Sequence, residues 1–414
     1  MIRSVALAAV ALLALSGCSD TGGPADGTAT DIASPAGPDS RFPRLAVSAD
    51  GTVWMSWLET AGDKLEFLRA ASLRGDRWSE SFDIAGGADW FINWADFPSL
   101  IVGTEDFMAA HWLAKRPGGT YAYDVMMSVS NDGGHSWNAP FSPHHDGTAT
   151  EHGFVSLYRS ERGFGAVWLD GRNMATDPDS SASGHEHGSG GMTLRAAMMD
   201  WDGRILQGAQ IDDLTCDCCQ TGAAMTTAGP LVVYRDRDGR EVRDIYFSVY
   251  RDGHWTPGRP VAVDGWQIAA CPVNGPALAA RGGGAVVGWF TGAPRPAVRA
   301  AFWSDADGTF AAAIDVDGDR PLGRIDSVLL PDGSAVISWL AATDDQSASI
   351  RYRRVRPDGV LGPIHYLAEV PAARSSGFPQ METGAQGLVF AWTVPGEPSQ
   401  IRTATVPIPP AGGG

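Results

Sequence analysis

A short hydrophobic pattern recurs along the chain and sets the period of its structure. Each copy has a turn with Gly, a few small or β-branched residues and then an aromatic residue, as in DGTVWMSW, GGAVVGW and GLVFAW. The final aromatic residues of the seven copies are Trp57, Trp112, Trp168, Tyr234, Trp289, Trp339 and Trp392. The intervals between them are 55, 56, 66, 55, 50 and 53 residues, and the long interval contains a polar insertion, MATDPDSSASGHEHGSGG. Even spacing of this kind indicates seven repeats of one structural unit.

Each unit contains the pattern of four short strands. An apolar segment precedes the aromatic phrase and forms a hairpin with it, and a second hairpin with an Asp/Gly turn follows, as in YFSVYRDGHW. Helical periodicity is almost absent, so we expect an all-β fold, a β-propeller with four-stranded blades, seven by repeat count. Stacked β-sandwiches are the alternative, but they would not require such even spacing. The last unit, Gly377 to Ile408, is short, and an upstream strand near Thr30 to Ser34 would complete it.

One of the second-hairpin turns carries a resemblance to a known family. Residues 130–137, SNDGGHSW, fit the Asp-box S-x-D-x-G-x-[ST]-W through Ser130, Asp132, Gly134 and Trp137, and weaker copies stand at residues 252–255 and 307–310. The chain therefore resembles the sialidase superfamily of β-propellers. The resemblance implies six blades, against seven by repeat count. The box itself is structural: its Asp accepts backbone N–H groups and its Trp packs between strands.

The N-terminus reads as an export signal. Arg3 precedes an apolar run from Val5 to Leu15, too short to span a bilayer, and the stretch ending at Cys18 resembles the lipobox of bacterial lipoproteins. The resemblance implies a signal peptide at 1–17 and a lipid on Cys18, and Ser19 favours the outer membrane, on its periplasmic or surface face. Residues 18–40 read as a flexible tether and 41–409 as the propeller domain. A plain cleaved signal is the alternative.

Composition narrows the partners. The net charge is −17, with acidic residues spread throughout, which argues against nucleic acid and anionic membrane surfaces as ligands. We expect a monomer attached to the membrane only through its lipid, with a glycan or a periplasmic or surface protein as the candidate partner. Export also places the four cysteines beyond Cys18 in an oxidising compartment, where disulfides persist.

The candidate site is the mouth of the propeller channel. The first strand of each blade is expected to lie innermost, so the loop leading into it faces the channel, and ligand sites gather there. The seven leading loops carry more charged and polar residues than turns require: Arg41, Asp96, Glu151, His152, Asn274, Arg324 and Asp326. We interpret them as a binding rim.

The resemblance to sialidases implies roles for three of these residues. Arg41-Phe42-Pro43 is similar to the family's Arg-Ile-Pro motif, whose Arg grips a substrate carboxylate. Arg324 would supply a second guanidinium and Asp96 the acid/base. The family's nucleophile, a Tyr activated by a Glu, is not found: none of the eight tyrosines lies at a leading loop or beside Glu151. Sialidase turnover is therefore not expected, and whether the chain is an enzyme stays open.

The cysteines allow three interpretations. Residues 215–221, TCDCCQT, lead into the fourth unit and Cys271 leads into the fifth, so Cys216, Cys218, Cys219 and Cys271 should converge. They could form disulfides, at least one joining the cluster to Cys271. They could instead hold a soft metal ion, copper or zinc, together with His152, or exchange disulfides. Accessory metal ligands would be His144, His145, His185, His187 and Met192.

These observations leave three functional hypotheses. The first is recognition, extending to hydrolysis, of an acidic glycan or similar anion at the channel mouth. The second is metal handling through the Cys/His/Met cluster. The third is a non-catalytic, protein-binding propeller, because one propeller scaffold serves many functions.

Overall fold

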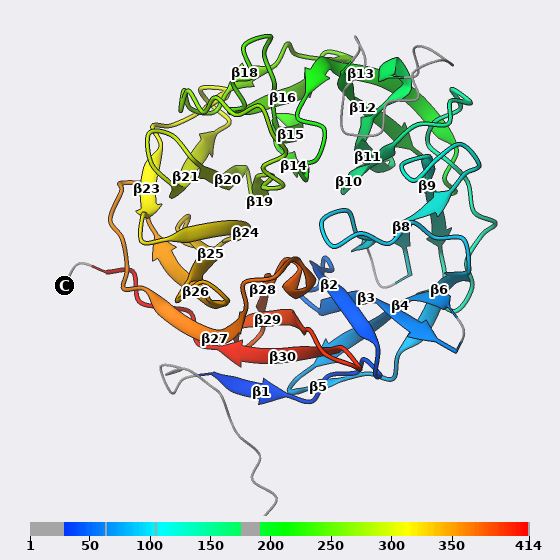
Figure 1. The fold of residues 1–414 in the computed structure, drawn as a ribbon, viewed down its shortest axis with the longest axis horizontal. Helices are drawn as coiled ribbons and strands as arrows, with labels where there is room; N and C mark the ends of the chain where they lie inside the picture. The colour runs from blue at the N-terminus through cyan, green and yellow to red at the C-terminus, as the bar shows by residue number, and fades with distance from the viewer. Residues whose placement is uncertain (1–28, 63, 104–105, 175–190, 413–414) are drawn as a thin grey trace, which may run out of the picture.

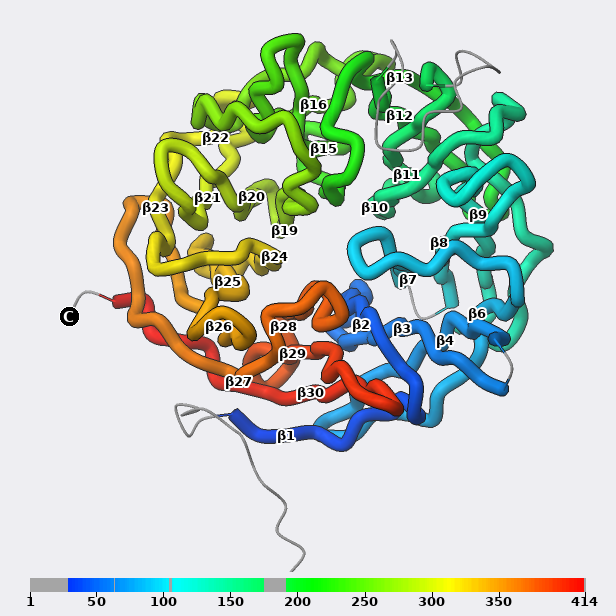
Figure 2. The backbone as a smooth tube through the Cα atoms, viewed as in Figure 1, coloured from blue at the N-terminus to red at the C-terminus, as the bar shows by residue number. Residues whose placement is uncertain are grey.

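The chain forms a ring of seven sheets around a central channel (Figure 1; Figure 2). This computed structural model describes residues 29–62, 64–103, 106–174 and 191–412. The predicted β-propeller with seven blades is confirmed, and the six blades implied by the resemblance to sialidases are not found. Consecutive antiparallel strands run outward in each blade, because each hairpin turn places a strand beside its predecessor.

The first three blades take residues 40–215. Blade 1 contains β2 (Ser40–Val47), β3 (Val53–Ala61), β4 (Leu65–Arg74) and β5 (Arg77–Trp78), with β6 (Phe82–Gly87) also paired to β4. Blade 2 has three strands in the described residues: β7 (Ser99–Val102), β8 (Met108–Lys115) and β9 (Tyr123–Ser130). Blade 3 contains β10 (His152–Ser160), β11 (Gly163–Asp170), β12 (Met192–Met199) and β13 (Ile205–Thr215), with the 3₁₀ turn η1 (Arg172–Met174) after β11.

The other four blades complete the ring. Blade 4 contains β14 (Gly222–Thr226), β15 (Gly229–Arg235), β16 (Ile245–Arg251), β17 (His254–Trp255) and β18 (Arg259–Pro260). Blade 5 contains β19 (Ala277–Arg281), β20 (Gly284–Thr291), β21 (Ala297–Ser304), β22 (Thr309–Phe310) and β23 (Ile314–Asp317). Blade 6 contains β24 (Pro321–Leu329), β25 (Ala335–Ala342), β26 (Ser347–Val355) and β27 (His365–Pro371). Blade 7 contains β28 (Gln380–Gly384), β29 (Gly387–Val394) and β30 (Gln400–Val406), with the 3₁₀ turn η2 (Arg374–Ser376) before β28.

The N-terminal strand closes the ring. β1 (Thr30–Ile32) pairs antiparallel with β30 and forms the outermost strand of blade 7, where Figure 1 shows it beside β30. The predicted completion of the short last unit is thus confirmed. The propeller therefore begins upstream of residue 41, inside the segment interpreted as tether. Residues 1–28, with Cys18, lie outside the described part of the chain.

The repeated aromatic residues lie in the second strand of each blade and are buried. Each of the seven is 4% exposed or less. In blades 1, 3, 5, 6 and 7 the Trp stands opposite an Arg of the third strand, as Trp339 stands opposite Arg351. Asp317 accepts hydrogen bonds from both, at 2.8 Å from Trp339 Nε1 and 3.4 Å from Arg351 Nη1. The repeated Trp is thus buried while its indole N–H keeps a hydrogen-bond acceptor.

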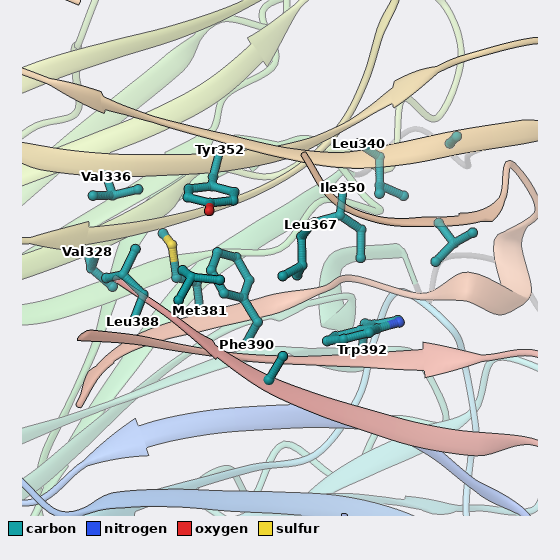
Figure 3. Close-up of a cluster of buried hydrophobic side chains, with 14 of the residues drawn as sticks. Val328, Val336, Leu340, Ile350, Tyr352, Leu367, Met381, Leu388, Phe390 and Trp392 are labelled. Carbon is teal, nitrogen blue, oxygen red and sulfur yellow. The ribbon is translucent and has the colours of Figure 1, made fainter. Parts of the chain in front are cut away.

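Apolar side chains fill the space between neighbouring blades. Figure 3 shows the cluster between blades 6 and 7, where Leu340 and Ile350 of blade 6 face Phe390 and Trp392 of blade 7. Burial of such side chains contributes about 1.5–3 kcal/mol each. Each sheet of the ring is covered on both faces by its neighbouring blades in this way. No helix in the described residues is long and apolar enough for a bilayer crossing.

The turn at residues 130–137 is tied by its own side chains. Asp132 Oδ1 accepts the Ser136 N–H at 2.9 Å, and Ser130 Oγ accepts the Gly134 N–H at 2.9 Å. Hydrogen bonds from Ser136 and Ser130 lower the pKa of Asp132 to about 2. Trp137 packs partly buried against a cluster shared by blades 1 and 2. The turn holds structure and contributes no group to the channel mouth.

Candidate functional site

A pocket of about 450 Å³ opens where the leading loops meet, and we call it the mouth pocket. It draws on the loops before β7, β10, β14, β19 and β28, so five blades contribute to it. Its walls include Trp94, Tyr121, Glu151, Phe154, Met174, Asp217, Cys218, Cys271 and Arg374. Of the seven predicted rim residues, Glu151 alone lines this pocket, together with Cys218 and Cys271 of the predicted cysteine cluster. The mouth pocket is the candidate ligand site.

Several predicted rim residues bond the next blade instead of facing solvent. Asn274 Oδ1 accepts the Arg324 N–H at 2.8 Å, and Asp326 Oδ2 accepts the Met381 N–H at 2.7 Å. Asp96 Oδ1 likewise accepts the Phe154 N–H at 2.7 Å. We call these contacts blade clips, because each joins the leading loop or innermost strand of one blade to the following blade.

The clips to Phe154 and Arg324 follow from the backbone conformation of these two residues. Phe42, Phe154 and Arg324 occupy equivalent bulges in their innermost strands and have φ of 53°, 53° and 54°, a left-handed conformation that is strained for side-chain-bearing residues. The bulge turns each N–H away from its own blade, so the neighbouring blade must supply an acceptor. Thr393 Oγ1 does so for Phe42 at 3.0 Å. Part of the polar rim therefore satisfies the backbone.

Arg41 and Arg324 do not project into the mouth pocket. Arg41 Nη2 forms an ion pair with Glu66 at 2.7 Å, and Arg41 Nη1 donates to Thr60. Arg324 Nη1 donates to the carbonyls of Ala373 and Gly377 at 2.9 and 3.0 Å, and its guanidinium lies 4.9 Å from the Trp94 ring. Each guanidinium is thus held by protein groups, and the anion-gripping role expected from the resemblance stays a prediction.

A tyrosine does lie beside Glu151, which corrects the sequence interpretation. Tyr123 Oη donates to Glu151 Oε1 at 2.7 Å and lies 3.0 Å from Asp96 Oδ2. Tyr123 belongs to β9, the third strand of blade 2, and spacing from the leading loops could not place it there. It is 0% exposed and stacks on Phe91 with ring centroids 4.0 Å apart. A ring buried in this way cannot attack a ligand in the pocket.

The two carboxyl groups that share this tyrosine hold protons more tightly than usual. Burial raises the pKa of Glu151 to about 8 and that of Asp96 to about 7, although hydrogen bonds from Tyr123 act to lower both. Burial and the two acids raise the pKa of Tyr123 above its usual range. Gly153 leaves room for the array, since a Cβ there would lie 1.9 Å from Asp96 Oδ2. Near neutral pH Glu151 therefore presents a protonated carboxyl to the pocket.

His152 belongs to a different cluster from the cysteines. It is 0% exposed, stacks on His144 with ring centroids 4.0 Å apart, and its Nε2 lies 3.2 Å from Asp146 Oδ2. Burial and the neighbouring His152 lower the pKa of His144 to about 4. Arg172 already pairs with Asp170 at 2.7 Å and with Asp146 at 3.2 Å, so a cation is built into this cluster. The expectation that His152 joins the thiols is wrong.

Of the predicted accessory ligands, His144 lies beside His152, in the cluster separate from the thiols. His145 is exposed, whereas Met192 is buried in β12, where its backbone pairs with Thr215. His185 and His187 lie outside the described residues.

The four cysteines converge as predicted. Cys216 Sγ lies 3.0 Å from Cys219 Sγ and 4.0 Å from Cys218 Sγ, and Cys218 and Cys271 both line the mouth pocket. Cys216 and Cys219 are buried, whereas Cys271 is exposed. All four are free thiols in this structure, and the disulfide to Cys271 stays a prediction.

Six of the named wall residues escaped the sequence interpretation: Trp94, Tyr121, Phe154, Met174, Asp217 and Arg374. Asp217 stands between two cysteines and could have been found from that motif. Tyr121 lies in the β8–β9 connection, which a survey of leading loops does not include. Trp94 and Arg374 precede their innermost strands by several residues, beyond the positions aligned on the repeated aromatic.

Comparison with known proteins gives distant likenesses in fold. No family model matches the chain, and no curated protein matches its sequence. A protein of unknown function from Dyadobacter fermentans is 16% identical, with 92% of this chain and 98% of that chain covered and a TM-score of 0.49. An α-L-arabinofuranosidase from Fusarium graminearum is 12% identical (92% and 97% covered, TM-score 0.48), and a leech intramolecular trans-sialidase is 12% identical (88% and 67%, TM-score 0.43). Likenesses at this level carry no argument about the chemistry of the pocket.

Proposed function

We propose that the protein recognises an acidic oligosaccharide in the mouth pocket. The observation that carries this proposal is the makeup of the pocket wall: the rings of Trp94 and Tyr121 stand beside the Glu151 carboxyl and the Arg374 guanidinium. Sugar rings present apolar C–H faces that pack on aromatic rings, and hydroxyls that hydrogen-bond to carboxyl groups. A guanidinium binds a carboxylate or sulfate substituent. Tyr121 is 48% exposed, so its ring is accessible to a ligand.

The same pocket supports hydrolysis of the bound glycan. Glycoside hydrolysis needs one protonated and one ionised carboxyl group near the scissile bond. Glu151, with its pKa raised to about 8 by burial, supplies the proton for the leaving oxygen. Asp217, in an ion pair of 3.1 Å with Arg237, supplies the carboxylate that takes a proton from water. Sialidase chemistry is not part of the proposal, because Tyr123 is buried.

In this proposal the propeller acts outside the cytoplasm, held to the outer membrane by a lipid on Cys18. The support is the lipobox-like stretch ending at Cys18, with polar residues following it. A pocket on such a tether meets glycans of the envelope or of the surroundings.

The binding test compares a charged ligand with a neutral one. Calorimetric titration with an oligomer of uronic acids should give saturable binding, and a neutral oligomer of the same length should bind more weakly because Arg374 then has no anion. Tyr121→Ala should weaken binding by about 10-fold, or about 1.4 kcal/mol. The control is Tyr366→Ala, since Tyr366 is 39% exposed on the outermost strand β27. Equal effects of the two substitutions, or no saturable binding, would refute the proposal.

The catalytic part has its own readout. Glu151→Gln keeps the shape of the side chain but cannot donate the carboxylic proton, so it should bind the oligouronate as the wild type does and lose release of reducing ends. A fluorogenic α-sialoside should give little or no turnover with either protein. Turnover of that sialoside, abolished by Arg41→Ala, would restore the sialidase interpretation.

A further inference from the structure

We propose that the four cysteines at the channel mouth form a thiolate site for a thiophilic d¹⁰ cation, Cu(I) or Zn(II). The site lies in the wall of the mouth pocket but does not depend on the glycan proposal. Cys216, Cys218 and Cys219 place their sulfur atoms within 4.8 Å of one another. Cys271, from the leading loop of the next blade, lines the mouth pocket together with Cys218 and would complete the set.

The contact pattern favours a shared ion over disulfides. In a disulfide each sulfur has one sulfur partner at about 2 Å. Here Cys216 has two sulfur neighbours, Cys219 Sγ at 3.0 Å and Cys218 Sγ at 4.0 Å, and all three sulfur atoms lie within 4.8 Å of one another. In tetrahedral geometry with metal–sulfur bonds of about 2.3 Å, neighbouring thiolates lie roughly 3.8 Å apart. Three thiols grouped in this way, with Cys271 lining the same pocket as Cys218, match a common ligand better than separate pairs do.

Two arginines offset the charge that such a site accumulates. Arg243 Nη1 lies 3.3 Å from Cys216 Sγ, and Arg235 lies near enough to affect Cys216 and Cys219 electrostatically. Both guanidinium groups are buried with their residues, at 2% exposure each. Cys216 is buried, and without these cations a thiolate there would be unfavourable in free energy. The buried part of the cluster can therefore hold a negatively charged thiolate.

The geometry also provides a route in. Cys216 and Cys219 are 0% and 2% exposed, whereas Cys218 and Cys271 line the mouth pocket. An ion arriving through the pocket would meet the two outer thiols first and then exchange onto the inner pair. Among the described residues, the group of Cys216, Cys218 and Cys219 includes no carboxylate or imidazole, and all-sulfur donor sets select Cu(I) and Zn(II) over hard cations.

The test measures metal and thiols on the full chain. Protein isolated without oxygen is assayed for bound copper and zinc, stripped, and titrated with Cu(I) or Zn(II) against a chromophoric chelator. We expect about one equivalent of one of these ions, at least about 10-fold weaker retention in Cys271→Ser, and none in Cys216→Ser. Cys271 is exposed, so its substitution tests the site even if Cys216→Ser fails to fold. Cys18→Ala is the matched control and should bind as the wild type does.

The thiol count separates the alternatives. In Cys18→Ala every thiol belongs to the cluster, so removal of the metal should expose four thiols per chain. Isolation of that variant with no free thiol, no metal, and a cross-linked peptide that contains Cys271 would overturn the proposal and establish disulfides. Loss of oligouronate binding in Tyr121→Ala with the metal retained would leave this site standing independently of the glycan proposal.

Discussion

Replacement of Asp96 by Asn should stabilise the folded protein, and the gain should grow as the pH rises. Asp96 is 2% exposed, and burial raises its pKa to about 7 although hydrogen bonds from Phe154 and Tyr123 act to lower it. The Asn amide has the same shape and can still accept the Phe154 N–H, but it carries no charge. The variant therefore removes the cost of a buried carboxylate without opening a cavity.

The sign and size follow from proton binding. In the unfolded chain Asp96 loses its proton near the ordinary pKa of 3.8, whereas the folded protein keeps it up to about 7. Between these values the folded state binds more protons, so the free energy of unfolding falls by about 1.4 kcal/mol per pH unit. The stabilisation is present in full below the unfolded pKa and is lost, on the order of 4 kcal/mol, by the folded pKa. The Asp96→Asn variant has no carboxyl group at this position, so it does not lose this part of the unfolding free energy as the pH rises.

Urea unfolding at about pH 5 and about pH 8 measures the effect, and the gap between variant and wild type should widen by on the order of 2–3 kcal/mol. The comparison cancels the titration of those groups whose pKa does not depend on Asp96. Asp76→Asn is the control, because the Asp76 side chain is 82% exposed and its substitution should change little at either pH. A gap that stays constant between the two pH values, or an Asp96 variant less stable at the higher pH, would refute the reasoning.

Two further predictions concern the anchor and the repeat. Cys18→Ala should leave protein that is recovered in the soluble fraction, because a lipid is the proposed membrane attachment; retention in membranes after a high-salt wash would contradict it. Trp339→Ala should lower the free energy of unfolding by about 3–5 kcal/mol, because removal of a ring 1% exposed leaves a cavity and Asp317 loses one of its hydrogen-bond donors. Trp201→Ala, at a ring 39% exposed, should cost much less in the same urea titration, and equal losses would contradict the role of the repeat.

Blade number and strand order could be predicted because each blade folds from a contiguous stretch of chain. The interval between repeated aromatics is the length of one blade, and the alternation of apolar residues and Asp/Gly turns marks the hairpins. Even the closure by β1 was foreseeable, since the last repeat is one strand short. The convergence of Cys216 and Cys271 follows in the same way, because equivalent positions in neighbouring repeats lie side by side.

The roles of the rim side chains could not be predicted, because their partners come from other blades. The partner of Asp96 is the backbone of Phe154, 58 residues away, and Asn274 bonds Arg324 at a separation of 50 residues. Nothing in the sequence shows that a bulge with positive φ turns those N–H groups toward the preceding blade. The sequence therefore indicated that Asp96 is a ligand-binding group, whereas in the structure its carboxylate accepts a backbone N–H of the next blade.

The pocket chemistry also depended on tertiary structure. The sequence placed Glu151 at the channel mouth, but only packing brings Tyr123 from β9 within 2.7 Å of it and buries the pair deeply enough to raise the pKa of Glu151 to about 8. The sequence likewise placed four thiols together, whereas only the fold gives the distances among the sulfur atoms of Cys216, Cys218 and Cys219. Local periodicity specified the propeller, because hairpins form between neighbours in the chain. The protonation of Glu151 and the distances among the thiols were decided by the fold, because both depend on what surrounds an atom in space.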